Sequence, residues 1–473
     1  MLNNLLFILK EGKDKILYKI NNNTITYEEA YYKVLELSTN LNKQGNSSVI
    51  IYGHKSINQF VSILACIIAK RCYIPIDLCT PISRIEEIIK KTNSTLLIKN
   101  EPLEINTIES LTVEEINNKY KNEEFVFNQT NKLAYIIFTS GSTGNSKGVP
   151  ITYHNLNNFI NWITKTKELK QCKNINILSQ ASFSFDLSVM DIYFSTYKKN
   201  TIIALEDNSN EFLDTTLKII KDEKINLLIM TPTFVKVLLL EKDFNSSNFK
   251  DIKCMFFCGE CLETVVAKKI KERFPQVMLI NAYGPTEATC CVTLTEITNN
   301  MLEIDYLPVG RISTSACKIE IENNEIILKG KSVFQGYLDT KSDNYYKEKN
   351  TNCYKTKDLG YIKNDLLYCT GRLDNQIKYQ GYRIELGDIE NNLLKLKEIR
   401  EAVVVAKYKE NTNIVKLIKA YIVLNNNNIT KEEIKEKLNK LLPHYMIPKV
   451  IEILDTIPVN NNGKYDRKKL SEL

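Results

Sequence analysis

Histidine and long apolar runs are both scarce in this sequence. Three histidines occur among 473 residues, so a histidine-rich metal centre is not expected. The longest apolar run, at residues 64–69, is far shorter than the ~18 residues that cross a bilayer. The apolar stretch at residues 5–9 is also short and follows polar rather than basic residues, which is not typical of a signal peptide. We therefore expect a cytoplasmic protein that is not inserted into a membrane.

Neither sign of charge dominates the chain. Its 63 Lys and Arg against 56 Asp and Glu leave a net charge of +7, whereas nucleic-acid-binding proteins concentrate basic residues on one face. The 12 cysteines are scattered and follow no secretory signal, which favours reduced thiols. Cys254, Cys258 and Cys261 are closely spaced, but no fourth ligand follows at a zinc-like interval. Cys254 falls in a predicted buried strand, so core packing is favoured over a metal site.

The first two thirds of the chain alternate between helical and strand patterns. Helical periodicity occurs at residues 26–41, 58–70 and 83–92, and Thr26 and Glu29 have the spacing of a capping box. This alternation predicts an α/β domain built on a parallel sheet, and a chain of this length exceeds one domain. Strand-type runs lie at residues 48–52, 95–98, 134–138, 225–229, 253–257 and 277–280.

The pattern changes after about residue 310. Residues 318–321 and 325–328 flank a short polar turn, which indicates a hairpin and therefore antiparallel structure. Beyond residue 374 the sequence predicts a compact α+β unit with a second capping box, Thr430 and Glu433. We predict a large domain at 1–373, combining parallel or mixed sheets with an antiparallel subdomain, and a small domain at 374–473. The small domain's expected elements are helices near 387–397 and after 430, and strands at 402–406 and 417–423.

A segment rich in glycine and hydroxyl groups follows the strand at 134–138. It reads Thr139-Ser-Gly-Ser-Thr-Gly-Asn-Ser-Lys-Gly148. Its glycines let backbone amides approach an anion, and Lys147 adds positive charge. It is not a Walker A loop, because two residues separate Gly144 from Lys147. The segment alone is compatible with a phosphate-binding loop or with a flexible strand-to-helix turn.

Further motifs follow in order along the chain. With the glycine-rich segment, this series resembles the adenylate-forming superfamily of acyl- and aminoacyl-activating enzymes over nearly the whole sequence. Within it, residues 183–191, 256–260 and 282–289 are most similar to the stand-alone D-alanine–D-alanyl carrier protein ligases. The motifs are Tyr283-Gly-Pro-Thr-Glu287, Tyr354-Lys-Thr-Lys-Asp358, Gly371-Arg-Leu-Asp374, Gly381-Tyr-Arg-Ile-Glu385 and Asn462-Gly-Lys464.

The resemblance implies a two-step reaction. A carboxylate attacks the α-phosphate of ATP to form an acyl-adenylate and pyrophosphate, and the phosphopantetheine thiol of a carrier protein then takes the acyl group. No carrier-like segment follows Lys464, so we expect a small acidic carrier acting in trans, and a monomeric enzyme. D-Alanine is the preferred substrate. The alternatives are another small amino acid (proline, serine or L-alanine) in natural-product assembly, or a nucleotide-binding module without activity.

The family's motifs also imply roles for single residues. Because a carboxylate is a weak nucleophile and repels the triphosphate, positioning and charge neutralisation must supply the catalysis. Lys464 is the expected cation between substrate carboxylate and α-phosphate, and Glu287 the Mg²⁺ ligand. Tyr283 would face adenine, Asp358 would accept the ribose hydroxyls with Arg372 nearby, and Asp374 would be the hinge of a mobile small domain. The remaining ATP-site residues are Thr139, Ser140, Gly141, Ser142, Thr143, Gly144, Lys147, Ala282, Gly284 and Thr286.

Asp186 implies an amino-acid substrate. In the family this position pairs with the α-ammonium group, and a buried aspartate without a cation is costly. The alternative is that Asp186 caps the following helix. The matched pocket positions are uncharged, which favours a small uncharged side chain: Leu187, Met190, Ile229, Phe256, Cys258, Ala282, Cys290 and Cys291.

Lys357 departs from the family pattern. The family usually has glycine immediately before the ribose-binding aspartate, and glycine permits a positive φ or a close backbone approach. We therefore expect Lys357 to alter the ribose contact and the nucleotide affinity.

Overall fold

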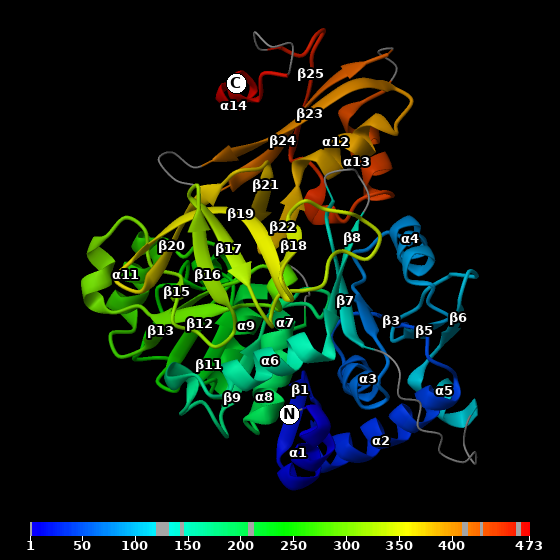
Figure 1. The fold of residues 1–473 in the computed structure, drawn as a ribbon, viewed down its shortest axis with the longest axis vertical. Helices are drawn as coiled ribbons and strands as arrows, with labels where there is room; N and C mark the ends of the chain where they lie inside the picture. Colours follow the sequence, from blue (N-terminus) through cyan, green and yellow to red (C-terminus); the bar gives the residue numbers. More distant parts are fainter. Residues whose placement is uncertain are drawn as a thin grey trace.

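The computed structural model describes residues 2–119, 132–141, 146–206, 212–408, 415–425, 429–459 and 465–473. A large unit holds three sheets, and a smaller unit beginning with β21 lies beyond them along the longest axis (Figure 1). Asp374 lies between the last strand of the large unit and the first of the small one, and the domain boundary there stays a prediction. No helix among the described residues combines the length and the hydropathy that a bilayer-spanning segment needs.

The first sheet contains six strands in the order β6-β5-β3-β4-β7-β8. Its inner strands are parallel and joined by helices, as the alternating pattern predicts. The predicted capping box is present, because Thr26 and Glu29 bond reciprocally at the start of α2. Its elements are α1 (Leu5–Gly12), α2 (Tyr27–Lys43), β3 (Val49–Tyr52), α3 (Ile57–Ile68), β4 (Tyr73–Ile76), α4 (Ile82–Thr92), β5 (Leu96–Lys99), β6 (Glu109–Leu111), α5 (Val113–Lys119), β7 (Leu133–Thr139) and β8 (Lys147–Thr152).

The glycine-rich segment connects β7 to β8, which are antiparallel partners. The strand-to-helix interpretation of this segment is therefore wrong, because the element that follows it is a strand, β8, and not a helix. Nearly all of β8 is buried, and Pro150 fits there because β8 is an edge strand. A buried strand of this kind lacks the apolar–polar alternation by which a sequence distinguishes strand from helix.

The second sheet contains eight strands in the order β14-β13-β12-β11-β9-β10-β1-β2 and is parallel except at its two edges. Ligands of such sheets bind beyond the carboxyl ends of the strands. Asp186, Cys258 and Glu287 follow β9, β12 and β13, so the sheet gathers them at one end. Its strands are β1 (Ile16–Ile20), β2 (Asn23–Thr26), β9 (Asn176–Ser179), β10 (Thr201–Ala204), β11 (Leu227–Met230), β12 (Cys254–Phe257), β13 (Met278–Tyr283) and β14 (Thr293–Glu296), with helices α6 (Tyr153–Ile163), α7 (Leu187–Val189), α8 (Ser195–Tyr197), α9 (Phe212–Asp222), α10 (Pro232–Leu238) and α11 (Thr264–Arg273).

The third sheet is antiparallel and includes the predicted hairpin, β16 and β17. Its turn places Asn323 and Asn324 at φ 50° and 65°. Asparagine tolerates this left-handed conformation, which two-residue hairpin turns require. The strands are β15 (Gly310–Arg311), β16 (Lys318–Glu322), β17 (Glu325–Lys329), β18 (Tyr345–Glu348), β19 (Thr351–Lys363) and β20 (Leu366–Arg372).

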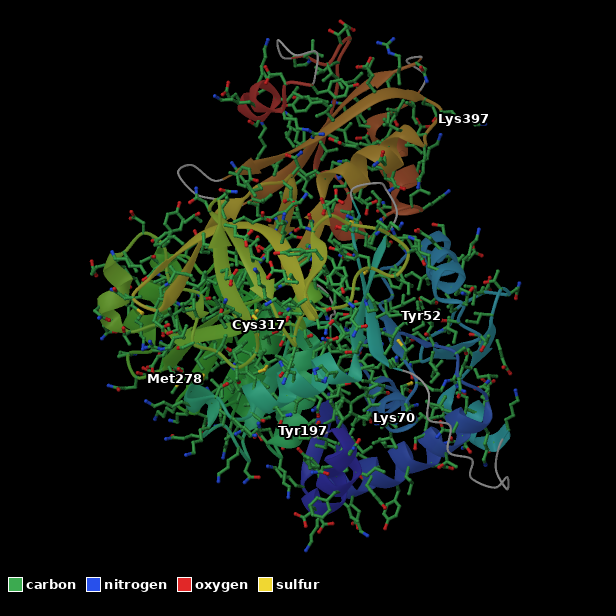
Figure 2. All side chains as sticks on the ribbon, in the orientation of Figure 1. Tyr52, Lys70, Tyr197, Met278, Cys317 and Lys397 are labelled. Carbon is green, nitrogen blue, oxygen red and sulfur yellow. The ribbon has the colours of Figure 1, made fainter. Side chains whose placement is uncertain are left out.

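The small unit begins with a separate hairpin, β21–β22, and packs two helices against one face of a three-stranded sheet and a third helix against the other. The capping box of Thr430 and Glu433 is present at the start of α13, as predicted. Cys317 lies within the large unit and Lys397 at the periphery of the small one (Figure 2). The elements are β21 (Gln376–Tyr379), β22 (Tyr382–Glu385), α12 (Leu386–Leu394), β23 (Ile399–Tyr408), β24 (Val415–Leu424), α13 (Lys431–Asn439), β25 (Val450–Ile453) and α14 (Arg467–Glu472).

A buried ion pair joins the two units. The guanidinium of Arg84 on α4 lies 2.5 Å from the carboxylate of Asp388 on α12, and both residues are buried. The hydroxyl of Ser83 also donates to the carbonyl of Lys440 at 3.1 Å. The pair fixes how the small unit is seated, since a buried charge without its partner is strongly destabilising.

Candidate active site

Asp186 lies at the start of the helix that follows β9, with its side chain turned into the protein. It is 9% exposed, and its Oδ2 accepts a hydrogen bond of 2.7 Å from the hydroxyl of Thr286. The side chain makes no capping bond to the helix, so the capping interpretation is wrong. Burial raises the pKa of Asp186 to about 6, although the Thr286 hydroxyl and the nearby Arg383 charge oppose this rise. Among the described residues, no cation forms an ion pair with this buried carboxylate.

The predicted lining of the amino-acid pocket belongs to one buried cluster. Hydrogen bonds with the thiols of Cys258 and Cys290, and then burial, raise the pKa of the Cys291 thiol. Thr289 and Cys290 both have positive φ, 65° and 71°, so the chain makes a sharp turn at this wall. The cluster contains all eight predicted positions: Leu187, Met190, Ile229, Phe256, Cys258, Ala282, Cys290 and Cys291.

Three residues with predicted nucleotide roles lie together at the end of β13. The hydroxyl of Tyr283 donates to Oδ2 of Asp358 at 2.7 Å, and Arg372 pairs with Oδ1. Arg372 also bonds Asp374 through Nε at 2.8 Å. The structure therefore joins the predicted ribose acceptor to the predicted hinge through a single guanidinium.

Gly284 follows this cluster where the backbone is crowded. A Cβ at this position would lie 2.4 Å from the Cα of Cys291, closer than non-bonded atoms can approach. Only glycine lets the segment carrying Tyr283 pass so close to the wall of the amino-acid pocket.

Glu287 is fully buried and both of its carboxylate oxygens have partners. Oε2 lies 2.6 Å from Nη1 of Arg383, and Oε1 accepts a bond of 2.6 Å from the hydroxyl of Tyr337. Burial by itself would raise the pKa of Glu287, but the charge and hydrogen bond of Arg383 lower it to about 2. The carboxylate is therefore ionised and held by a cation of the chain itself.

In this arrangement the chain's own groups occupy the place where magnesium is predicted at Glu287. A carboxylate suits this hard cation, but each oxygen of Glu287 already has one partner within the protein. Among the described residues, no three or more His, Cys, Asp or Glu side chains gather as a metal site. The role of Glu287 as a metal ligand stays a prediction.

The glycine-rich loop is described at both of its ends. The hydroxyl of Ser140 donates to the carbonyl of Arg383 at 3.0 Å and accepts from the amide of Glu385 at 2.9 Å. Lys147 holds its ammonium 5.7 Å above the ring of Tyr337. Thr139 ends β7, Gly141 follows the buried Ser140, and Thr286 bonds Asp186. Ser142, Thr143, Gly144 and Lys464 lie outside the described residues.

Comparison with known proteins decides the family. Residues 9–338 match the model described as AMP-binding enzyme, and residues 388–464 match the AMP-binding enzyme C-terminal domain. The chain belongs to the AMP-binding enzyme family. The D-alanine–D-alanyl carrier protein ligase of Listeria monocytogenes serotype 4a is 37% identical to it over 92% of this chain and 90% of the ligase. The ligase of that name from Staphylococcus epidermidis is 34% identical over 100% of this chain and 99% of its own.

Solved structures share the fold of this AMP-binding enzyme. The Vibrio cholerae adenylation domain AlmE, in complex with glycyl-adenosine-5'-phosphate, has a TM-score of 0.85 at 21% identity and covers 99% of this chain and 96% of its own. The Bacillus subtilis o-succinylbenzoate CoA synthetase MenE has a TM-score of 0.85 at 20% identity, and the match covers 99% of this chain and 98% of that of MenE. The predicted fold class and the predicted resemblance are both confirmed.

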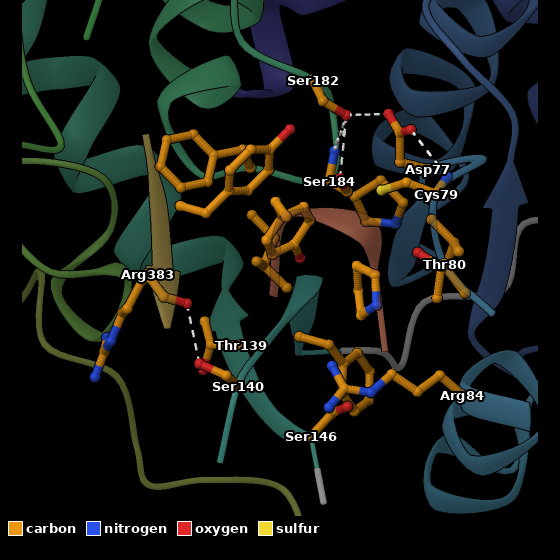
Figure 3. A pocket seen from close by; sticks show the side chains of 18 of the residues that line it. Asp77, Cys79, Thr80, Arg84, Thr139, Ser140, Ser146, Ser182, Ser184 and Arg383 are labelled. Carbon is orange, nitrogen blue, oxygen red and sulfur yellow. Dashed lines mark hydrogen bonds between the residues drawn. The ribbon is translucent and has the colours of Figure 1, made fainter. Parts of the chain in front are cut away.

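The AMP-binding enzyme also has a cavity between its two units that the sequence did not reveal (Figure 3). Tyr382 and Tyr445 of the small unit stack there with ring centroids 3.7 Å apart. From the large unit, the carboxylate of Asp77 accepts a hydrogen bond from the hydroxyl of Ser182 and lies 3.4 Å from Nδ1 of His54. No local pattern identifies such a cavity, because its walls come from segments up to 371 positions apart in the sequence, from Pro75 to Met446.

Lys357 has the conformation that glycine would favour. Its φ is 60°, its amide donates to Oε1 of Glu325 at 2.8 Å, and its carbonyl accepts from the amide of Leu373. Both bonds hold β19 in this left-handed turn immediately before Asp358. A side chain in this region costs roughly 1–2 kcal/mol, which the family's glycine avoids.

Replacing Lys357 by glycine should therefore stabilise the enzyme by about 0.5–1 kcal/mol, once the greater backbone entropy of glycine is subtracted. Chemical unfolding followed by circular dichroism measures the change. Lys363→Gly on the same strand is the control, because Lys363 has an ordinary φ and glycine there should destabilise. Equal losses of stability in the two variants would contradict the prediction.

Proposed function

We propose that this enzyme activates D-alanine with ATP as D-alanyl-AMP and then transfers the D-alanyl group to the phosphopantetheine thiol of a separate carrier protein. The observation that carries the proposal is the buried carboxylate of Asp186, which lies next to a buried cluster of uncharged side chains. An isolated carboxylate there is costly until it meets a cation, and the ammonium of an amino acid supplies one. Curated relatives named as D-alanine–D-alanyl carrier protein ligases match over nearly the whole chain.

In the first step, Asp186 binds the ammonium group and the walls of the pocket admit a methyl side chain. An oxygen of the substrate carboxylate attacks the α-phosphorus, and the bond from that phosphorus to pyrophosphate breaks. Tyr283 would hold adenine, Asp358 the ribose hydroxyls, and Lys147 with the loop hydroxyls the outer phosphates. Their contribution is positioning and neutralisation of charge. Magnesium would arrive on the phosphates of the nucleotide rather than in a site built by the protein.

Lys464 is proposed to bridge the attacking oxygen and the α-phosphate. Val459 and Tyr465, the described residues on either side of its segment, pair with each other, and the hydroxyl of Tyr465 contacts Glu401 on β23 at 3.4 Å. Helix α14, which begins two residues after Tyr465, lies at the end of the molecule formed by the small unit, away from β7 (Figure 1). We therefore infer that adenylation uses another seating of the small domain, reached by rotation at Asp374.

In the second step, the carrier's thiol attacks the carbonyl carbon of D-alanyl-AMP. A carbon–sulfur bond forms, the bond to the phosphate oxygen breaks, and AMP and the thiol proton leave. The cavity between the units runs from Arg84 and Met446 to Asp186 and Thr286, and it offers a path for the carrier's arm. The carrier would act in trans, on a monomer located in the cytoplasm.

Amino-acid-dependent exchange of pyrophosphate into ATP should be fastest with D-alanine. Paired D- and L-forms of alanine, serine, valine and proline, together with glycine, form the panel. One methylene discriminates by about 1–3 kcal/mol, so the next substrate should be roughly 10–200-fold slower in kcat/KM. Fastest exchange with another amino acid would reassign the substrate, and no exchange with any of them would favour a nucleotide-binding module.

A further inference from the structure

Two cysteines of the large unit lie in contact at the end of the second sheet that is opposite the candidate active site. We propose that Cys172 and Cys254 are a redox-active dithiol, which a hydroperoxide converts to a disulfide. The bond joins the segment before β9 to the start of β12 and cross-links the large unit reversibly. All 12 cysteines lie among the described residues and carry free thiols, so the structure shows the reduced form.

The fold brings this pair together although 82 positions separate its members. Cys172 precedes β9 by four residues, and Cys254 is the first residue of β12. Asn226, which precedes β11, holds both strands: its Oδ1 accepts from the amide of Asn176 at 3.0 Å, and its carbonyl accepts from the amide of Cys254 at 3.1 Å. Both cysteines belong to one buried cluster, and their thiols form a hydrogen bond. A disulfide between thiols in such contact needs only a small movement of one segment.

The two thiols differ in a way that suits an attacking and a resolving cysteine. The hydrogen bond with Cys254 lowers the pKa of the Cys172 thiol, and the nearby ammonium of Lys198 also lowers it, against the effect of burial. The same hydrogen bond, and then burial, raises the pKa of Cys254. Cys172 is also the more exposed of the two, at 9% against 3%. Because the thiolate is the nucleophile in thiol oxidation, Cys172 reacts first.

The reaction has two steps. The thiolate of Cys172 attacks a peroxide oxygen, so that a sulfur–oxygen bond forms, the oxygen–oxygen bond breaks, and the leaving oxygen takes up the proton that Cys172 lost. The thiol of Cys254 then attacks the sulfur of the sulfenic acid, a sulfur–sulfur bond forms, and the hydroxyl group leaves with the thiol proton as water. Two thiols are oxidised and one hydroperoxide is reduced. A dithiol reductant reverses the change by exchange.

The thiols of the amino-acid pocket provide an internal comparison. Cys258, Cys290 and Cys291 are each at most 3% exposed. Although Cys291 forms a hydrogen bond with Cys290, burial and neighbouring acidic groups raise the pKa of Cys290 to about 11. A thiol that stays protonated at neutral pH reacts slowly with a peroxide. The pocket thiols should therefore remain reduced while the pair of Cys172 and Cys254 oxidises.

The cross-link should stabilise the large unit without changing its chemistry. Asp186 and Cys258 follow the carboxyl ends of β9 and β12, whereas the pair lies at their amino ends. Strand β12 is hydrogen-bonded to β11 and β13, so the segment before β9 makes the movement. Met278, which pairs in register with Cys254, lies in the part of the large unit away from the small unit (Figure 2). A bond across so long a loop restricts the unfolded chain and so favours the folded state.

Peptide mapping of the full chain tests the pair directly. The reduced protein is treated with a small molar excess of hydrogen peroxide, its remaining thiols are alkylated in denaturant, and it is digested without reductant. The peptides containing Cys172 and Cys254 should be recovered joined, and dithiothreitol should separate them. Alkylation of both cysteines, or a disulfide within the pocket cluster in place of this one, overturns the proposal. No substrate is present, so the result does not depend on the proposed function.

The variant Cys254→Ser tests the order of the two steps. Without the resolving thiol, the sulfenic acid of Cys172 should persist after peroxide treatment, and dimedone should trap it at that residue. Cys317→Ser is the matched control, because Cys317 is another buried thiol of the same cluster and burial raises its pKa to about 12. This variant should form the cross-link as wild type does. Dimedone adducts on other cysteines but not on Cys172 overturn the assignment of the attacking thiol.

Unfolding in urea measures the effect of the cross-link. The midpoint of oxidised wild type should lie above that of the reduced protein by about 1 M or more, given the usual effect of a bond that closes a long loop. Cys317→Ser should show the same gain, and Cys254→Ser none. A cross-link that leaves the midpoint unchanged or lowers it overturns the stabilising role. If Cys254→Ser does not fold, the mapping and unfolding of wild type decide.

Discussion

Replacing Lys464 by alanine should lower the rate of D-alanyl-AMP formation by about 10²–10³-fold, the usual cost of losing one donor that acts in a transition state. The lysine is proposed to neutralise charge only where the carboxylate meets the α-phosphate. Pyrophosphate exchange at saturating D-alanine and ATP measures this first half-reaction. Lys468→Ala, an exposed lysine of α14, is the matched control and should leave the rate unchanged.

Transfer from preformed D-alanyl-AMP to the carrier should survive in Lys464→Ala. The thiol step needs no charge between a carboxylate and the α-phosphate, and the flanking Tyr465 lies against Glu401, away from the cavity, in the seating described. An equal loss in both half-reactions would contradict a role confined to adenylation. It would point instead to a general effect of the lysine on the small domain.

Replacing Asp186 by asparagine should raise the KM for D-alanine by about 10²–10³-fold, because it leaves a buried ammonium without its anion. The KM for ATP should change little, which separates loss of the amino-acid contact from misfolding. Asp191→Asn is the matched control, since Asp191 is a buried carboxylate a few positions along the same segment and accepts a 2.7 Å bond from Ser179. A similar rise in the KM for D-alanine in both variants would refute the assigned contact.

The KM for D-alanine should also rise as the pH falls below about 6. Burial raises the pKa of Asp186 to about 6 in the free enzyme, so the carboxyl group is ionised above this pH and neutral below it. Only the ionised form attracts the ammonium, and affinity should fall about ten-fold for each pH unit below the pKa. Pyrophosphate exchange between pH 5 and 8 measures the profile, and a KM that stays flat to pH 5 would argue against this contact.

The sequence predicted those elements of the fold that have a short sequence signal of their own, such as a capping box or a turn. The capping boxes at Thr26 and Thr430 mark helices that form, and the polar turn at Asn323 marks a hairpin that forms. The edge strand β8 was missed, because its buried residues do not alternate. Lys357 has a positive φ, which glycine adopts easily, and this explains why the family usually has glycine at this position although the residue here is lysine.

The candidate site likewise contains contacts that the sequence predicted and one contact that it did not. Motif order assigned Tyr283, Asp358 and Arg372 to one nucleotide site, and the structure brings the three together. Tyr283 ends β13, and Asp358 within β19 is paired in register with Arg372 at the end of β20. The partner of Glu287 could not be predicted in this way. Arg383 lies 96 positions away on the other domain, and its contact depends on how two folded units are seated, which no local spacing records.

The ion pair between Arg84 and Asp388 has a consequence for chimeras in which domains are exchanged between related enzymes. Each domain contributes one charge to a contact from which water is largely excluded, and each charge is tolerable only while the other is present. A chimera that combines this large domain with a small domain lacking the aspartate would have the guanidinium of Arg84 buried at the domain interface without its partner. Hybrid ligases built from this chain therefore need both halves of the pair transplanted together.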